Sequence, residues 1–512
     1  MPKPQRGRTE TELKLVLSPP GEQRLEEIPA FRPPQSSEPK SERIVTTYFD
    51  TRNRDLARRG LSLRVRRAGE KRVQAVKAEG DAGAAKARGE WEWPIEREEP
   101  DLGLAASTPV ADALPPAIGK ALEPVVVTDV IRTKRTVQLE GNTIEAALDT
   151  GAIEAGDASQ PVHELELELR KGSPAALYRL ALALHAATPL AVEVESKAAR
   201  GYRLREGAPP HADKPGPPAL HRKIRAADGL CDIVANGISH LLMNRAVAMA
   251  GDAEGIHQTR VAIRRLRSAL RLFQPRLEPH AVSLFQDELQ RLGRVIGEAR
   301  DWDVFCVEML PESFEGDENS EWVGLVRDAA ERRRKEADAR SAREVGSPSF
   351  TALTLGLAAW TETGREQRAL LGDKRLKRKL AKIAPDLLDE LLRKVRRRGR
   401  AVQPDASASD LHPLRKSLKK LCYGVEFLTS LYPKKRVKRL LEPMKALQKS
   451  LGVINDAATA TRLAEELAGG GHLELGVPVG ALARSLEHAS RVAMRKLARQ
   501  WDDFRSRNPF WR

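Results

Sequence analysis

The sequence predicts an α+β protein of two parts, an N-terminal antiparallel sheet and a C-terminal all-helical region. Polar and apolar residues alternate in short runs through residues 1–206, which is the period of half-buried strands. A proline-dense segment at 207–218 then interrupts regular structure and is predicted to be a linker. From residue 219 to residue 512, alanine, leucine, arginine, glutamate and lysine dominate, and these residues favour helix.

The composition limits the classes of protein that fit. The 512 residues are enough for about two to four domains. Lysine and arginine number 87 against 71 acidic residues, which gives a formal net charge of +16. Such an excess attracts polyanions, whether nucleic acid, anionic lipid or phosphate chains. The three cysteines are scattered and predict neither a disulfide framework nor a zinc site. No apolar leader or membrane-spanning run is apparent, so we expect a soluble cytoplasmic protein.

Charged side chains occupy one face of the first predicted strand. Glu10, Glu12 and Lys14 recur at every second residue and therefore share a face, whereas Leu13 and Leu15 share the other. Two carboxylates beside an ammonium suit a hard cation bound next to a phosphate. The same pattern also describes any solvated edge strand, so its meaning depends on the strands that follow.

Later strands repeat this alternation, and their charged faces separate by sign. The cations that stand in phase on their strands are Arg64, Arg66, Lys77, Arg132 and Lys134. The carboxylates in phase are Glu145, Asp149, Glu164, Glu166 and Glu168. A half-exposed surface sheet also alternates, but it usually mixes the two signs. Closing these strands with their charged faces inward would bring both sets into one lumen, where a metal-bound polyphosphate could lie.

The motifs of this first part resemble the CYTH, or triphosphate tunnel metalloenzyme, superfamily. They are Glu10-x-Glu12-x-Lys14, Tyr48-Phe-Asp50, Leu61-Ser-Leu-Arg-Val-Arg66, Leu148-Asp149, Glu164-Leu-Glu-Leu-Glu168 and Ser196-Lys-Ala-Ala-Arg200-Gly-Tyr202. The resemblance implies that the sheet is an eight-stranded antiparallel tunnel. It also implies that the tunnel hydrolyses a triphosphate with a divalent metal, Mg²⁺ or Mn²⁺.

Carried over motif by motif, the resemblance implies a role for each charged residue. The metal ligands would be Glu10, Glu12, Asp149, Glu164 and Glu166. The triphosphate would be bound by Lys14, Arg64, Arg66, Lys77, Arg132, Lys134, Lys197 and Arg200. Arg200 is equally compatible with anchoring the last helix of this part. The catalytic candidates are Lys14 with Glu164, Glu166 and Glu168, and the sequence leaves open which carboxylate acts as the base.

Substrates of the superfamily range over inorganic triphosphate, thiamine triphosphate, nucleoside triphosphates and the ATP that adenylate cyclases cyclise. A protein that recognises a nucleotide or thiamine needs aromatic side chains for stacking at the tunnel mouth, and this part of the chain has few aromatic residues. Inorganic triphosphate, cleaved to pyrophosphate and phosphate, is therefore the first expectation. The alternatives are one of the other triphosphates, or a polyphosphate-binding or targeting protein whose tunnel has lost turnover.

An internal repeat organises the helical region. The run His257-Gln-Thr-Arg260-Val-Ala-Ile-Arg264-Arg-Leu266 is matched by His412-Pro-Leu-Arg415-Lys-Ser-Leu-Lys419-Lys-Leu421, at an offset of 412 − 257 = 155. The same offset relates Asp301 to Asp456. An offset kept without a gap indicates two copies of one unit. Steps of three and four residues place the polar positions of each copy on one helix stripe, beside an apolar stripe.

The repeat resembles the CHAD domain, a pair of helical bundles that often follows a CYTH domain and is associated with polyphosphate binding. We expect polyphosphate to contact His257, Arg260, Arg264, Arg267, His412, Arg415 and Lys419. Each histidine is equally compatible with a structural role, bonded to Asp301 or Asp456 of its own copy. We also expect association with polyphosphate granules and no membrane partner. Nucleic acid is disfavoured because the basic helices carry almost no aromatic residues for stacking. The oligomeric state is left open.

Overall fold

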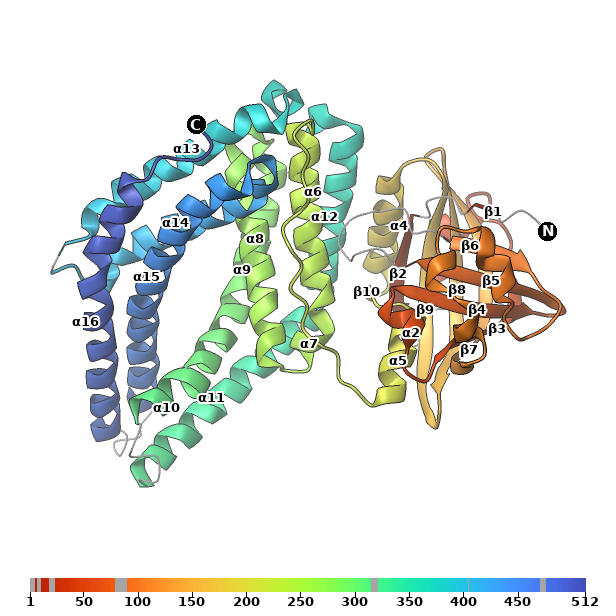
Figure 1. The fold of residues 1–512 in the computed structure, drawn as a ribbon, viewed down its shortest axis with the longest axis horizontal. Coiled ribbons are helices and arrows are strands. Elements are labelled where there is room, and N and C mark those ends of the chain that lie inside the picture. The colour runs from red at the N-terminus through yellow and green to blue at the C-terminus, as the bar shows by residue number, and fades with distance from the viewer. Residues whose placement is uncertain are drawn as a thin grey trace. The chain divides into compact units, whose positions relative to one another are not determined.

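The computed structural model describes residues 5–6, 11–17, 24–78, 90–314, 321–403, 405–469 and 476–512. It divides into two compact units, residues 1–211 with 347–362, and residues 212–346 with 363–512. The first unit contains the sheet and the second is helical, so the expected α+β fold is confirmed (Figure 1). The segment 347–362 belongs by its contacts to the first unit, although its sequence is helical like the second. The predicted domain bounds, 1–206 and 219–512, stay a prediction.

The sheet of the first unit is antiparallel throughout and strongly curved (Figure 1). Its described strands follow the order β1-β6-β5-β4-β3-β7-β8-β9-β2-β10. They are β1 Gln5–Arg6, β2 Glu12–Leu17, β3 Lys40–Thr51, β4 Leu61–Ala68, β5 Lys71–Ala78, β6 Glu90–Pro94, β7 Leu122–Leu139, β8 Asn142–Ala155, β9 Ala158–Lys171 and β10 Leu190–Glu193. The ten described strands exceed the expected eight because short strands, β1 and β10, stand at the two edges. Closure into a tunnel stays a prediction.

Alternation along the strands gives the sheet an apolar outer face. On β4 to β6, Leu63, Val65, Val76 and Trp93 are buried in one apolar cluster, while the charged residues between them point the other way. The helices of this unit are α2 Asp55–Arg58, α3 Pro116–Gly119, α4 Pro174–Ala187 and α5 Lys197–Glu206. Helix α4 packs on β2 and β9, as the apolar stripe of its sequence predicted. Helix α5 packs on β7 and β8.

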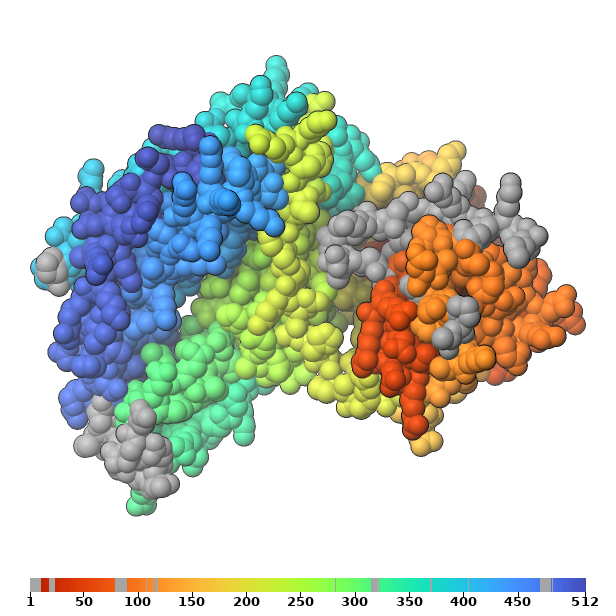
Figure 2. All heavy atoms as spheres, in the orientation of Figure 1, coloured from red at the N-terminus to blue at the C-terminus, as the bar shows by residue number. Residues whose placement is uncertain are grey.

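The second unit consists of helices. They are α6 Ala226–Met243, α7 Arg245–Met249, α8 Ala253–Phe273, α9 Pro279–Val304, α10 Leu310–Ser313, α11 Glu321–Gly346, α13 Leu380–Arg398, α14 Ala408–Leu428, α15 Lys434–Gly469 and α16 Gly476–Ser506. Helix α12, Pro348–Glu366, begins in the segment assigned to the first unit. Helices α15 and α16 lie side by side along their lengths (Figures 1 and 2). Along the described residues, no helix has both the length and the apolarity to cross a membrane.

The internal repeat is also a structural repeat. Helices α8 and α14 begin at 253 and 408 and end at 273 and 428, so both differences equal 155. Helices α9 and α15 begin at 279 and 434, again 155 apart. Asp252 and Ser407, at the same offset, cap α8 and α14 with their side chains. The apolar stripes of both copies are fully buried, which is why the polar stripes beside them keep matching positions.

Asp50 joins three elements of the first unit. Its buried carboxylate accepts hydrogen bonds from the backbone N–H groups of Thr51, Leu56 and Ala57 at 2.7–3.0 Å, which fixes α2 against the end of β3. It also accepts the hydroxyl of Tyr202 on α5 at 3.0 Å. Two of the sequence motifs, around Asp50 and Tyr202, therefore meet in a structural contact.

Replacing Asp50 should destabilise the first unit. We expect Asp50→Ala to lower the free energy of unfolding by about 3 kcal/mol, because three buried N–H groups lose their acceptor. Tyr202→Phe should cost about 1 kcal/mol, since only one hydrogen bond is removed. Urea unfolding followed by tryptophan fluorescence measures both. The control is Asp157→Ala at an exposed turn, and an equal loss in that variant would contradict the assignment.

Candidate functional site

One face of the sheet collects the charged residues of its strands. Lys14 on β2 stands opposite Glu166 on β9, and Glu164 on β9 stands opposite Asp149 on β8. Asp149 in turn stands opposite Arg132 on β7. The same register continues across β3 to Arg64 and Arg66 on β4, Lys77 on β5 and Glu90 on β6. The predicted sharing of a face is therefore observed for all of these residues.

Three carboxylates surround the ammonium of Lys197 at the N-terminus of α5. Its Nζ lies 2.9 Å from Asp149, 2.8 Å from Glu164 and 2.9 Å from Glu166. Ser196 caps the helix by accepting the Ala199 N–H, and this places Lys197 in the first turn over the sheet. We call Asp149, Glu164 and Glu166 the carboxylate group.

Two arginines complete the charge balance of the carboxylate group. Arg132 donates to both oxygens of Asp149 at 2.5–2.6 Å and to Glu166 at 2.7 Å. Arg200, one turn after Lys197 on α5, forms an ion pair with Glu164, and both side chains are buried. Arg200 thus anchors α5 to β9, which was the structural one of the two roles that the sequence left open.

The carboxylate group shifts the protonation of its members. Burial would raise the pKa of Glu166, but Lys197, Arg132 and Lys14 outweigh it and hold that pKa well below its usual range. Burial would lower the pKa of Lys197, but Glu166, Asp149 and Glu164 raise it above its ordinary value. Both partners stay charged near neutral pH, so the site presents fixed charges to a ligand.

The cations of β4 and β5 lie on the same face. Glu90 binds both Arg64, at 2.6 Å, and Lys77, at 3.3 Å. Arg66 makes no ion pair with a carboxylate among the described residues. The charge of Arg64, burial and then the charge of Arg132 lower the pKa of Arg66 below its ordinary value. Phosphate oxygens would relieve this crowding of like charges.

A more exposed row runs beside the carboxylate group. Glu12 stands opposite Glu168, and Glu168 stands opposite Glu145. Lys14 lies 3.2 Å from Glu12, and Arg170 pairs with both Glu145 and Glu168. Lys134 is at the edge of this row, 3.8 Å from Glu42 and 3.9 Å from Glu145.

The donor set fits a hard divalent cation. The predicted metal ligands that the structure describes offer only carboxylate oxygens, the donors that Mg²⁺ and Mn²⁺ prefer. Three of them already surround one positive centre, the Lys197 ammonium. Among the described residues, no three His, Cys, Asp or Glu side chains are arranged to hold a metal ion. Glu10, a predicted ligand, lies outside the described residues.

The sequence did not predict the interaction partners of Glu90, Glu145 and Tyr48. Glu90 and Glu145 alternate correctly in the sequence, but their partners depend on which strands become neighbours. Tyr48 is buried on the charged face and acts on Arg64, where packing alone was expected. Knowledge of the strand order would have identified all three.

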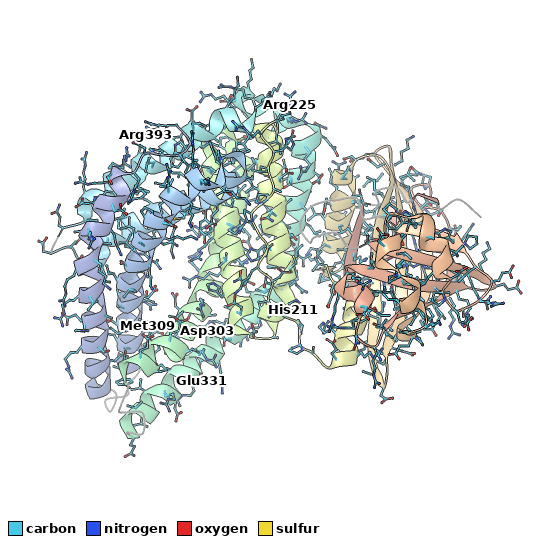
Figure 3. The ribbon with its side chains drawn as sticks, viewed as in Figure 1. His211, Arg225, Asp303, Met309, Glu331 and Arg393 are labelled. Atoms are coloured by element: carbon cyan, nitrogen blue, oxygen red, sulfur yellow. The ribbon has the colours of Figure 1, made fainter. Side chains whose placement is uncertain are left out.

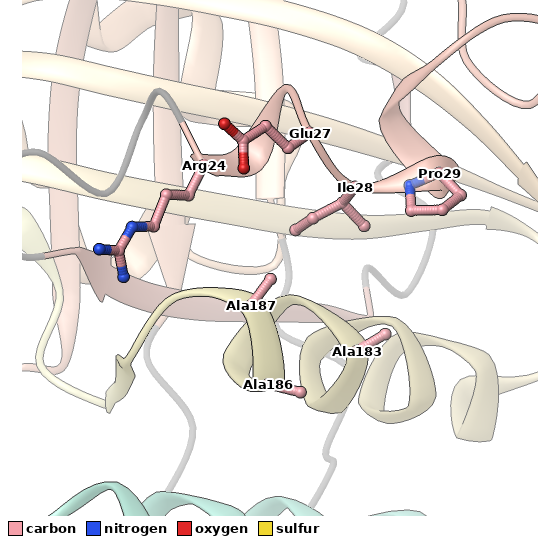
Figure 4. A pocket seen from close by; sticks show the side chains of 7 residues that line it. All are labelled: Arg24, Glu27, Ile28, Pro29, Ala183, Ala186 and Ala187. Carbon is pink, nitrogen blue, oxygen red and sulfur yellow. The ribbon is translucent and has the colours of Figure 1, made fainter.

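Two pockets in the described part of the first unit are lined by residues other than those of this face. One is formed by Arg24, Glu27, Ile28 and Pro29 against the last turn of α4 (Figure 4). Figure 4 shows the three alanines of α4 that close its other side. Its lining is largely apolar and contains none of the predicted site residues, so we assign it no chemistry.

In the second unit, each repeat forms the same ion pair. Arg260 on α8 binds Asp301 on α9 at 2.8 Å, and Arg415 on α14 binds Asp456 on α15 at 3.3 Å. The expected alternative, in which these aspartates bind the histidines, is wrong for His412, whose Nδ1 bonds to the side-chain oxygen of Asn455 at 2.9 Å. The aspartates instead hold the arginines, because a guanidinium forms strong charge-assisted hydrogen bonds with a carboxylate.

His257 differs from its counterpart. Its buried Nδ1 has no hydrogen-bond partner among the described residues. Burial and then the charge of Arg300 lower the pKa of His257 to about 4. Arg300 occupies the position that Asn455 holds in the second copy, since 455 − 155 = 300. The His257 ring is therefore neutral at neutral pH and can meet a phosphate only through a hydrogen bond.

The polar stripes of α8 and α14 face each other. Arg264 lies near the ring of Tyr423 on α14, with its guanidinium carbon 5.9 Å from the ring centre. The Lys419 ammonium is repelled by the positive charges of Arg264, Arg415 and Arg260. Burial and these like charges lower the pKa of Lys419 to about 7. We call Arg260, Arg264, Arg415 and Lys419 the inter-repeat cluster.

Further cations continue from the inter-repeat cluster along both helices. They include Arg267 and Arg271, which belong to the stripe predicted from the sequence, and the additional residues Lys416 and Lys420. Burial, Arg271 and then Lys394 of α13 lower the pKa of Lys420. Helix α13 thus contributes Lys394, which lies outside the sequence stripe, to this basic surface.

Another buried ion pair lies apart from this surface. Arg334 on α11 reaches Asp303 on α9 at 3.4 Å and Glu331 at 2.7 Å, and both carboxylates are labelled in Figure 3. Burial raises the pKa of Asp303. Within the described residues these carboxylates form no metal-binding group, so we read them as helix packing.

Comparison with known proteins agrees with the two units. The model of the CYTH domain matches residues 8–202, and that of the CHAD domain matches residues 232–465. The chain therefore contains a CYTH domain followed by a CHAD domain. An inorganic triphosphatase from Haemophilus influenzae is 31% identical over 198 residues, or 38% of this chain and 54% of that protein. The chain thus matches about half the length of this curated relative.

Matches to solved structures were found for parts of this chain. The CHAD domain from the plant Ricinus communis is 26% identical, with a TM-score of 0.50, and the match covers 59% of this chain and 98% of that one. A putative adenylyl cyclase from Hippeastrum with a dominant triphosphatase activity is 20% identical, with a TM-score of 0.29. That match covers 38% of this chain and 95% of the other.

Removing Lys197 should destabilise the first unit in a pH-dependent way. We expect Lys197→Met to cost about 3 kcal/mol at pH 7, because two buried carboxylates and the half-buried Glu166 lose a shared cation. The loss should shrink as pH falls below about 4.5, where carboxylates take up protons and no longer repel. The reason is that the lowered pKa of Glu166 stabilises the folded protein fully above its ordinary range, and this contribution is lost progressively as pH falls below that range. Urea unfolding at pH 7 and pH 4 tests this, with exposed Lys71→Met as the control. A loss that is independent of pH would contradict it.

Proposed function

We propose that this protein is a metal-dependent hydrolase that cleaves inorganic triphosphate to pyrophosphate and phosphate. The observation that carries the proposal is the division of charge on one sheet face. Carboxylates gather around Lys197, whereas Arg64, Arg66 and Lys77 gather three to five strands away along the sheet. A triphosphate needs cations for its oxygens, and a hard metal ion needs carboxylates. The similarity to an inorganic triphosphatase supports the class of substrate.

In the proposed reaction a water attacks a terminal phosphorus, and the bond from that phosphorus to the bridging oxygen breaks. The products are pyrophosphate and phosphate, and one proton is released to solvent. Lys14, Arg64, Arg66 and Arg132 bind phosphate oxygens and neutralise the charge that shifts to the bridging oxygen. Lys77 and Lys197 would assist.

The carboxylates have different proposed roles. Glu164 is 1% exposed and held by Lys197 and Arg200, so it serves as an anchor. Glu166 and Glu168, with side chains 17% and 22% exposed, are placed to orient the water. Mg²⁺ or Mn²⁺, held by Glu10 and Glu12 with the carboxylate group, would neutralise phosphate oxygens and acidify the bound water.

The placement of aromatic residues favours inorganic triphosphate over nucleotides or thiamine triphosphate. Trp93 is buried on the outer face, with Trp91 packed against the same cluster. Phe31 lies under the guanidinium of Arg135, and the hydroxyl of Tyr202 is used by Asp50. In the described part of the first unit, these rings are engaged in packing and not available to stack on a base.

Glu166 offers a direct test of the catalytic proposal. We expect Glu166→Gln to lower phosphate release from tripolyphosphate by at least about 100-fold, since a fixed charge that orients the water is lost. The control is Glu154→Gln, at an exposed position of the neighbouring strand β8. Circular dichroism checks the fold of both variants. Full activity in Glu166→Gln would overturn the assignment of the carboxylate group.

A specific observation supports a second function, the binding of polyphosphate by the helical unit. The inter-repeat cluster holds four cations from two helices, and only Asp301 and Asp456 offset them within ion-pair distance among the described residues. A flexible anion with regularly spaced charges would compensate the rest. A non-catalytic polyphosphate-binding protein is the alternative reading of the whole chain. A cytoplasmic location on polyphosphate granules would follow from either.

Binding should depend on the arginines of both repeats. We expect Arg260→Ala combined with Arg415→Ala to weaken polyphosphate binding by about 100-fold, because two charge-assisted contacts of about 1.5 kcal/mol each are lost. Tripolyphosphate hydrolysis should stay within about twofold of the wild type. The matched control is Arg491→Ala, whose side chain is 61% exposed on α16. Equal binding of RNA at matched charge and salt would contradict polyphosphate as the ligand.

A further inference from the structure

Two of the four cations in the inter-repeat cluster have no carboxylate partner. Arg260 and Arg415 are paired with Asp301 and Asp456. Within the described residues, neither Arg264 nor Lys419 has an acidic group at ion-pair distance. The Arg264 guanidinium instead meets the ring of Tyr423. The cluster therefore carries excess positive charge in a half-buried place.

Lys419 is the member of the cluster that can give up its charge. Guanidinium groups stay protonated in proteins, whereas a partly buried ammonium releases its proton readily. Lys419 lies on α14 one turn after Arg415 and one turn before Tyr423, whose ring meets the Arg264 guanidinium of α8. The charged groups near Lys419 come from three helices: Arg260 and Arg264 on α8, Arg415 on α14, and Asp456 on α15. From α13, the named cation Lys394 acts on Lys420, the next residue along. Three cations thus outweigh one carboxylate around the Lys419 amine.

We propose that polyphosphate binding at the inter-repeat cluster is coupled to the uptake of one proton by Lys419, so that affinity falls as pH rises above neutrality. The proposal rests on the proposed binding function and adds its regulation. In the free protein, burial and three like charges favour the neutral amine. Phosphate oxygens placed among the same groups favour the ammonium, so a proton moves from solvent to Nζ as the chain binds. No phosphorus bond forms or breaks.

The sign of the pH dependence follows from proton linkage. Burial and then Arg264, Arg415 and Arg260 lower the pKa of Lys419 to about 7 in the free protein. Bound phosphate raises that pKa again, so the complex holds more protons than the free protein above pH 7. Affinity should then fall by up to about tenfold per pH unit for one proton. His257, with a pKa of about 4, stays neutral over this range and adds nothing to the slope.

Titration calorimetry of the full-length protein with long-chain polyphosphate tests this coupling. Measurements at pH 7.5, 8 and 9, in pairs of buffers with different ionisation enthalpies, count the protons taken up. Terminal phosphates, with a second pKa of about 6, are already deprotonated there. We expect the wild type to take up about one proton per site at pH 8.

Two variants and one control make the result specific. Lys419→Arg keeps the charge permanently, so its uptake should fall to near zero and its affinity should change little with pH. Lys419→Met cannot be charged, so it should bind more weakly at pH 7.5 and also take up no proton. Lys438→Arg is the same substitution at a lysine that is 76% exposed, and it should behave as the wild type.

The outcomes separate the inference from the function on which it rests. Tight binding by the wild type without proton uptake, or uptake that survives in Lys419→Arg, would overturn the inference alone. Absence of polyphosphate binding at every pH would overturn the binding function and the inference with it. Circular dichroism of all four proteins checks that the helical unit is folded in each one.

Discussion

The pairing of Lys197 with three carboxylates is the interaction on which the first unit depends. Asp149 and Glu164 are almost fully enclosed, and isolated charges in such a place would be costly. Lys197, Arg132 and Arg200 offset that cost, and two of these three come from one helix, α5. The same contacts fix α5 on the sheet, so the charges that define the site also hold its scaffold together.

In the second unit, like charges are crowded together, whereas opposite charges are paired in the first. A repeat of two similar helices brings like charges together at the place where the copies meet, and the buried apolar stripes of both copies keep them there. The energetic cost of that crowding falls on Lys419 and Arg415, whose pKa values are both lowered, first by burial. An anionic ligand would convert this cost into affinity.

Much of this arrangement could be predicted from the sequence. The period of two put Glu12 and Lys14 on one face, and the gapless offset of 155 anticipated the matching bounds of α8 and α14. The partners could not be predicted, because they depend on strand order and helix placement. Lys197 was expected to bind phosphate, but its ammonium lies among carboxylates. The N-cap at Ser196 places it there, in the first turn of α5. His412 was expected to hydrogen-bond Asp456, but it bonds Asn455 because Arg415 forms an ion pair with that aspartate.

The central claim is that the charged face of the sheet turns over a triphosphate with a divalent metal. The most direct measurement is phosphate release by the purified protein from tripolyphosphate, thiamine triphosphate, ATP and long-chain polyphosphate, each with Mg²⁺, Mn²⁺ or EDTA. Strong metal-dependent release from tripolyphosphate, and little from the other substrates, is the predicted result. No release from any substrate, together with tight retention of long chains, would contradict the enzyme and leave a polyphosphate-binding protein.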